Sequence, residues 1–160
     1  MRKRSSYRPR HVNPLAHITA LKGASLLDQA DRNAFNAPVQ AAVDSIAAGV
    51  ANRDHWQALF DAVNTLEQLF RVGLAEDWRE WFEGAQEQVV GILDRQRDTG
   101  SRALYPAELA TLRELAGTWA DILEVVSCRE MFNAQAAASV KVRNALAGGV
   151  ASARIVEALA

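Results

Sequence analysis

The stretch from Asn52 to Gly73, NRDHWQALFDAVNTLEQLFRVG, decides the fold class of this chain. Its large apolar residues recur every three or four positions, a spacing that places them on one face of an α-helix. They are Trp56, Leu59, Phe60, Val63, Leu66 and Phe70. Asparagine is a favoured N-cap residue and glycine a favoured residue just after a helix. The pattern therefore predicts one amphipathic helix between Asn52 and Gly73.

Three more helices are expected downstream. The first covers about 75–97, with apolar residues from Trp78 to Leu93 on one face, and ends at Asp98-Thr99-Gly100. The next begins at Pro106, a residue type that fits the first helical turn. The last begins at Ser127, which forms a capping-box pattern with Glu130, and runs to Gly148-Gly149.

Upstream, Asn13-Pro14 predicts the start of a short helix that ends at Gly23. The region 28–48 is helical in pattern but contains Pro38. Because proline has no N–H and obstructs the preceding turn, either the helix begins near Pro38, with Asn36 as a candidate cap, or a short helix precedes a kink. We expect two helical pieces there. Short connections between the four later helices predict a bundle of those four, with the N-terminal helices packed across it.

The composition fits an all-α protein. The 160 residues are 49% hydrophobic and 23% charged, with only four prolines, which is ordinary for a globular chain. We expect a single-domain helical bundle of five to seven helices over 13–160, preceded by a basic and flexible arm over 1–12. No apolar run reaches the roughly 18 residues of a membrane span. The single cysteine, Cys128, excludes an internal disulfide framework and favours a cytoplasmic protein.

Charge is divided unevenly along the chain. The first ten residues contain five cations around one tyrosine, and no carboxylate occurs before Asp28. Between Asp28 and Glu130 there are 18 carboxylates, nine arginines and no lysine. Such an arm could bind phosphates and stack its ring on a base, contact an acidic protein surface, or have no specific role. Its candidate binding residues are Arg2, Lys3, Arg4, Tyr7, Arg8 and Arg10.

Five carboxylates of the expected helix over 75–97 are spaced by four, three, four and seven residues. At about 100° per residue they share one face, opposite the apolar face. This acidic stripe consists of Glu76, Glu80, Glu83, Glu87 and Asp94. It is either a solvated face or a recognition surface for an arginine- or lysine-rich protein. A metal site is disfavoured because no Glu-x-x-His motif accompanies the glutamates.

Nothing in the sequence indicates catalysis. His55 is expected to be a polar residue of a first helical turn, and Cys128 a small residue at an interhelical turn with no histidine near it in sequence. No glycine-rich phosphate loop occurs. The four tryptophans are expected in the core, with the alternative that Trp78 and Trp81 define one edge of a groove between helices; the other two are Trp56 and Trp119. We expect a non-enzymatic protein that uses no cofactor and no metal.

Three stretches of the chain resemble small uncharacterised helical proteins encoded by phages and prophages of proteobacteria, and the similarity covers most of the chain. They run from Lys3 to Pro14 (KRxxYRPRxVNP), from Asn52 to Leu69 (NRDxW leading into AVNxxExL) and from Val126 to Met131 (VxCREM). The resemblance implies a phage-encoded accessory protein in the cytoplasm of a bacterial host. By analogy, such a protein would bind and inhibit a host complex, for example one of defence or nucleic-acid binding.

The leading expectation is therefore a protein that binds a host macromolecule through the acidic stripe. The alternative is a nucleic-acid-binding accessory or regulator that uses the arm. A homodimer that buries the aromatic helix over 75–97 across a two-fold axis is a further open possibility.

Overall fold

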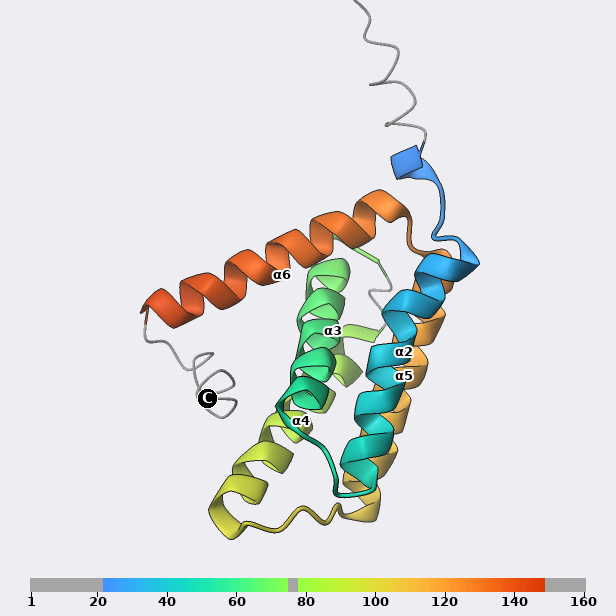
Figure 1. Ribbon diagram of the computed structural model, residues 1–160. Coiled ribbons are helices and arrows are strands. Elements are labelled where there is room, and N and C mark those ends of the chain that lie inside the picture. Colours follow the sequence, from blue (N-terminus) through green and yellow to red (C-terminus); the bar gives the residue numbers. More distant parts are fainter. Residues whose placement is uncertain (1–21, 75–77, 149–160) are drawn as a thin grey trace, which may run out of the picture.

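The computed structural model describes residues 22–74 and 78–148, and its long elements are all helices (Figure 1). Within these residues there is no β-strand, and the one isolated antiparallel bridge joins Leu26 to Ser127. The predicted all-α helical bundle is confirmed. The arm over 1–12 and most of the helix expected before Gly23 lie outside the described residues. The five long helices are α2 (Gln29–Ala47), α3 (Arg53–Arg71), α4 (Arg79–Thr99), α5 (Pro106–Val125) and α6 (Cys128–Gly148).

Helix ends follow the local signals in the sequence. Asn52 caps α3, since its Oδ1 accepts from the His55 N–H at 3.1 Å while His55 Nδ1 accepts from the Asn52 N–H at 3.1 Å. Past the ends of α3 and α4, Gly73 and Gly100 take left-handed backbone angles, with φ of 92° and 68°. A side chain would strain that conformation, which explains glycine at both positions.

The start of α6 carries the predicted capping box. Ser127 Oγ accepts from the Glu130 N–H at 3.3 Å, and Glu130 Oε2 accepts from the Ser127 N–H at 2.8 Å. These two hydrogen bonds satisfy amide groups that a helix N-terminus leaves without partners. The turn between α5 and α6 is therefore sharp and fixed.

The expectation of two helical pieces around Pro38 is wrong, because α2 continues through Pro38 from Gln29 to Ala47. Asp28 caps its start, with Oδ1 accepting from the Asp31 N–H at 2.8 Å. The turns after the proline bury Val39, Ala42, Val43 and Ile46. The free energy gained by burying these side chains exceeds the cost of the hydrogen bond that Pro38 cannot make, so a single helix is favoured.

The arrangement of the helices also differs from the expected one. In the structure α2 is one of the bundle helices and packs against both α3 and α5, and α4 packs on α5 (Figure 1). It is α6, rather than an N-terminal helix, that crosses the others and packs on α3. The buried side of α6 is made largely of alanines, including Ala134 and Ala138, which let the two backbones approach closely.

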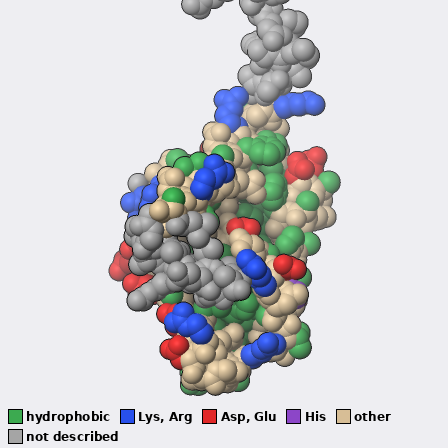
Figure 2. Space-filling view, turned by 60° about the vertical axis from the view of Figure 1, so that its left-hand side comes forward, with side chains coloured by type: hydrophobic (Ala, Val, Ile, Leu, Met, Phe, Trp, Pro, Cys, Tyr) green, Lys and Arg blue, Asp and Glu red, His purple; other side chains and the backbone are tan. Residues whose placement is uncertain are grey.

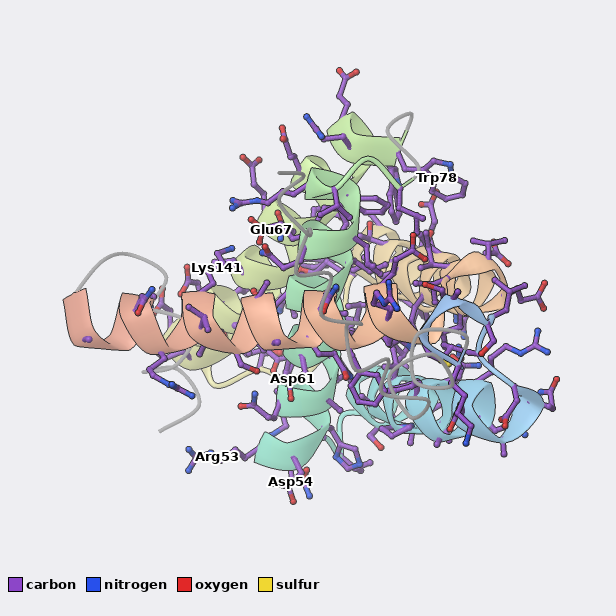
Figure 3. The ribbon with its side chains drawn as sticks, turned by 90° about the horizontal axis from the view of Figure 1, so that it is seen from above. Arg53, Asp54, Asp61, Glu67, Trp78 and Lys141 are labelled. Atoms are coloured by element: carbon purple, nitrogen blue, oxygen red, sulfur yellow. The ribbon has the colours of Figure 1, made fainter. Side chains whose placement is uncertain are left out.

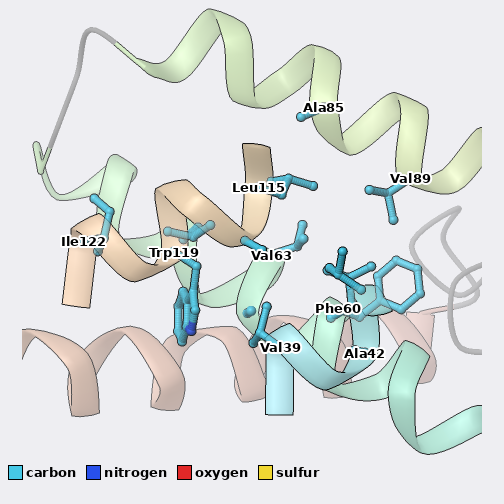
Figure 4. Packing of buried hydrophobic residues seen from close by; sticks show 14 of the residues in the cluster. Val39, Ala42, Phe60, Val63, Ala85, Val89, Leu115, Trp119 and Ile122 are labelled. Carbon is cyan, nitrogen blue, oxygen red and sulfur yellow. The ribbon is translucent and has the colours of Figure 1, made fainter. Parts of the chain in front are cut away.

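The buried side chains of α2, α3, α4 and α5 form one hydrophobic core (Figure 4). α6 covers this core where it packs on α3. Phe70 of α3 meets Phe82 of α4 edge to face, with 4.9 Å between ring centroids. Trp119 of α5 is buried, and its Nε1–H donates to the Phe35 carbonyl oxygen of α2 at 3.2 Å. This bond uses the polar atom of a buried indole and fixes α5 against α2.

All four tryptophans were expected in the core, but Trp78 and Trp81 are not fully buried. Trp56 and Trp119 are buried, Trp81 is only partly buried, and Trp78 is 41% exposed. Trp78 is the N-cap residue of α4, at the end of the helix, and contacts Trp81 edge to face at 5.9 Å between centroids.

Candidate partner-binding surface

Three glutamates of the acidic stripe lie on the outer face of α4. Glu80, Glu83 and Glu87 are exposed, whereas Phe82 and Ala85, between them in sequence, are buried against the rest of the bundle. The structure therefore places the carboxylates and the apolar side chains on opposite faces, as the spacing predicted. α4 lies at the margin of the bundle, so its outer face points to solvent (Figure 1).

These three carboxylates differ from Glu67 and Glu108, whose side chains pair with basic residues, and resemble Glu114 and Glu124 of α5, which are exposed and unpaired within the described chain. Within residues 22–74 and 78–148, no ion pair or hydrogen bond includes the side chain of Glu80, Glu83 or Glu87. By contrast, Glu67 of α3 pairs with Arg71 of its own helix and with Lys141 of α6 (Figure 3). The outer face of α4 thus carries three negative charges that no described side chain neutralises.

The fourth described member of the stripe behaves differently. Asp94 is half-buried, and its Oδ1 accepts from Arg97 Nη2 at 3.0 Å. This i,i+3 ion pair offsets the charge at the C-terminal end of the stripe. The fifth member, Glu76, lies outside the described residues, as do the arm residues Arg2 to Arg10. The exposed and unpaired part of the stripe is therefore Glu80, Glu83 and Glu87.

An arginine of the same helix is held away from this face. Arg95 donates to Glu108 at 3.1 and 2.5 Å and to the Ala103 carbonyl at 2.9 Å, and its guanidinium lies 4.5 Å from the centre of the Tyr105 ring. A bidentate pair with a cation–π contact is a strong and directional anchor. It ties α4 to the start of α5, so Arg95 does not pair with the glutamates of the outer face. Arg79, next to Glu80 in sequence, donates to the Phe70 carbonyl oxygen at 3.2 Å.

Two glycines beside the glutamates leave part of the outer face of α4 without side chains, a feature that the charge pattern did not reveal. Gly84 and Gly91 lie on α4 beside the glutamates, and a Cβ added to either would meet no heavy atom within 4 Å. Glycine lowers helix stability by about 1 kcal/mol relative to alanine, so packing within the chain does not explain these residues. A partner could approach the α4 backbone closely at both positions.

His55 and Cys128 both have contacts that belong to the fold. Besides its role in the α3 cap, His55 has Nε2 at 3.1 Å from Ser45 Oγ of α2. Cys128 is half-buried, with Sγ at 3.9 Å from both Ser25 Oγ and the Leu26 carbonyl oxygen. In the part of the chain that the structure describes, no three His, Cys, Asp or Glu side chains gather in a way that could hold a metal ion.

A polar groove lies between α3 and α6, with a volume of about 540 Å³. Asp61 lines it from α3, on the side that α6 crosses (Figure 3), and Arg143 lines it from α6. Burial raises the pKa of the Asp61 carboxyl above its ordinary value, and a hydrogen bond from Gln57 opposes that rise. The groove joins residues far apart in sequence, so no local motif could have revealed it.

The described helices include none that is both long and apolar enough to cross a membrane. The resemblance to phage-encoded proteins stays a prediction. Comparison of the chain with protein-family models, with curated proteins and with solved structures finds no match.

Proposed function

We propose that this protein is a non-enzymatic binding protein that captures a basic host macromolecule through Glu80, Glu83 and Glu87 of α4. The observation that carries the proposal is that these carboxylates are exposed on one helix face and have no partner among the described residues. Three like charges at this spacing repel one another, which costs stability unless a partner uses them. An arginine-rich protein surface is the chemistry that fits them best.

The biological setting of the proposal rests on the phage-type resemblance. We place the protein in the cytoplasm of a bacterial host, where it would bind and inhibit a host complex. A complex that normally holds nucleic acid is a suitable target, because its basic surface would accept an acidic helix face in place of phosphates.

Reversing the three charges tests the surface. The variant with Glu80, Glu83 and Glu87 all changed to lysine should lose its partner in affinity capture from a proteobacterial host lysate. The side chains are exposed, so the helical circular dichroism spectrum should not change. Nuclease treatment of the lysate should not release the partner, because the proposed contact is with protein.

A matched control separates this surface from net charge alone. Glu114, Asp121 and Glu124 are exposed carboxylates of α5, and reversing them changes the net charge by the same amount. This control variant should retain the partner. The proposal fails if the α4 variant captures the same proteins as the native chain, or if the α5 variant loses them equally.

The alternative function depends on the arm, whose five cations fall within the first ten residues. A nucleic-acid-binding accessory protein would retard DNA or RNA in a gel, with an affinity that falls steeply as salt rises. Deletion of residues 1–12 would abolish that retardation. Absence of binding even at low salt would reject this alternative.

A further inference from the structure

A hollow of about 630 Å³ lies where the segment before α2 meets the first turns of α6. The bridge between Leu26 and Ser127 builds it from parts of the chain that are far apart in sequence. The Cys128 N–H donates to the Ser25 carbonyl at 2.9 Å, and the Leu27 N–H donates to the Val126 carbonyl at 3.3 Å. These bonds on both sides of the bridge hold the walls in place.

Two large apolar side chains line this hollow and remain exposed. Leu26 is 57% exposed and Phe132 is 67% exposed. Phe132 is the more informative, because Tyr105 and Trp78, the other exposed aromatic residues of the described chain, are exposed by 61% and 41% and carry a polar atom. Unlike those two side chains, an exposed phenyl ring has no polar atom that could form a hydrogen bond with water and offset the cost of its exposure. Exposed apolar residues grouped around a hollow are typical of a binding surface.

Charges of both signs surround the same hollow. Asp28 and Asp31 line it from the start of α2, and Lys22 and Arg129 line it from the preceding segment and from α6. Arg129 lies so close to the backbone of Gly23 that a Cβ there would be 3.1 Å from its Nε. Figure 2 shows hydrophobic atoms at the surface near the upper end of the described part, with basic and acidic side chains beside them.

We propose that this hollow is the interface of a two-fold dimer, with a second copy of the chain as its occupant. A two-fold interface joins one patch to itself, so the patch must carry each feature together with its complement. This patch does so: the exposed Phe132 lines the hollow together with Leu26, and Lys22 accompanies Asp31. Across the axis, Phe132 of each copy would enter the hollow of the other, and each Lys22 would face the other copy's Asp31.

The structure argues against the dimer through the apolar face of α4. The aliphatic and aromatic residues centred on Ala85 are buried within the chain, so that face needs no second copy. Two copies meeting through the outer face of α4 would bring Glu80, Glu83 and Glu87 against the same charges. The hollow at the start of α6 is free of that repulsion because its charges are mixed.

The single cysteine gives a direct test of the proposed geometry. Cys128 lines the hollow, so the two Cys128 thiols of a dimer would both lie in the interface. A short bis-maleimide should therefore convert the native protein to a covalent dimer. Sedimentation velocity and native mass spectrometry over a concentration series should give a dimer in equilibrium with monomer.

Substitutions then identify the surface. Phe132→Glu should raise the dimer dissociation constant by about tenfold or more, since it removes an apolar anchor and adds a charge. Val140→Glu is the matched control: Val140 is also an exposed apolar residue of α6 but does not line the hollow, so this variant should dimerise normally. Lys22→Glu should weaken the dimer, and the double variant with Asp31→Lys should restore it.

Four results would overturn the proposal. The first is a native protein that stays monomeric at concentrations up to about 1 mM, where even weak association is detected. The second is equal weakening by Phe132→Glu and Val140→Glu. The third is a Cys128 thiol that reacts with maleimide only after residues 1–12 are deleted, because the arm would then be the occupant. The fourth is dimerisation unaffected by the charge swap at Lys22, which would place the interface elsewhere.

Discussion

Replacing Pro38 by alanine tests the reason why α2 is one helix. Pro38 is an interior residue of the 19-residue helix and its side chain is exposed. It cannot donate the helical hydrogen bond to the Ala34 carbonyl, and a proline inside a helix costs about 3 kcal/mol relative to alanine. Alanine also makes the unfolded chain more flexible, which offsets about 1 kcal/mol. Because little apolar burial is lost at an exposed position, we expect the variant to be more stable by about 2 kcal/mol.

Thermal and chemical unfolding measure this gain. For a chain of this size, 2 kcal/mol corresponds to a rise in Tm of roughly 4–8 °C. The urea midpoint should rise with an unchanged m-value, and the new amide N–H of residue 38 should be protected from hydrogen exchange.

A proline moved by one turn provides the control. Ala41 is an exposed residue of the same helix, and Ala41→Pro should destabilise the protein by about 3 kcal/mol or more if the helix is continuous there. No gain for Pro38→Ala, together with tolerance of Ala41→Pro, would mean that burial of Val39 and Ile46 does not require a continuous α2. The explanation offered for this helix would then be refuted.

Two further predictions concern titration. The hydrogen bonds from Ser127 lower the pKa of Glu130 below its ordinary value of 4.5, so its stabilising contribution is present above that value and is lost as pH falls through the folded-state pKa. Glu130→Ala should therefore lower stability by about 0.5–1 kcal/mol at pH 7 and by much less at pH 3; an equal loss at both pH values would contradict the capping role. Burial raises the pKa of the Asp61 carboxyl above 3.8 in the folded protein. The folded protein therefore loses stability as pH rises from 3.8 to the folded-state pKa. In urea titrations Asp61→Asn should be more stable than the native protein at pH 7 but not at pH 3, and the reverse order would show that the ionised carboxylate is stabilised in its groove.

The start of α3 and the end of α4 could be predicted because their causes are local. Asn52 caps α3 through a residue three positions away, and Gly100 ends α4 through its own backbone angle. The continuity of α2 could not, because the apolar contacts that favour it come from α3 and α5. Which helices are neighbours was equally out of reach, since short connections are compatible with several arrangements.

The candidate site could likewise be predicted only where its features are local in sequence. The spacing of Glu80, Glu83 and Glu87 fixes a common face as soon as the segment is helical. That Asp94 is paired could have been expected from Arg97, three residues later, but the anchoring of Arg95 to Glu108 depends on how α4 meets α5. The hollow beside Phe132 depends on contacts with the segment before α2, so the sequence of α6 alone carries no sign of it.

The bridge between Leu26 and Ser127 also bears on the order of folding. Ser25 and Cys128, which it brings together, are 103 positions apart. Closing a loop of that length costs about 4 kcal/mol of chain entropy, far more than two surface hydrogen bonds return. The bridge should therefore form only after the helices between its ends have collapsed and carried those ends together. A chain still emerging from the ribosome would lack this hollow altogether, which would keep nascent chains from pairing with one another before each has folded.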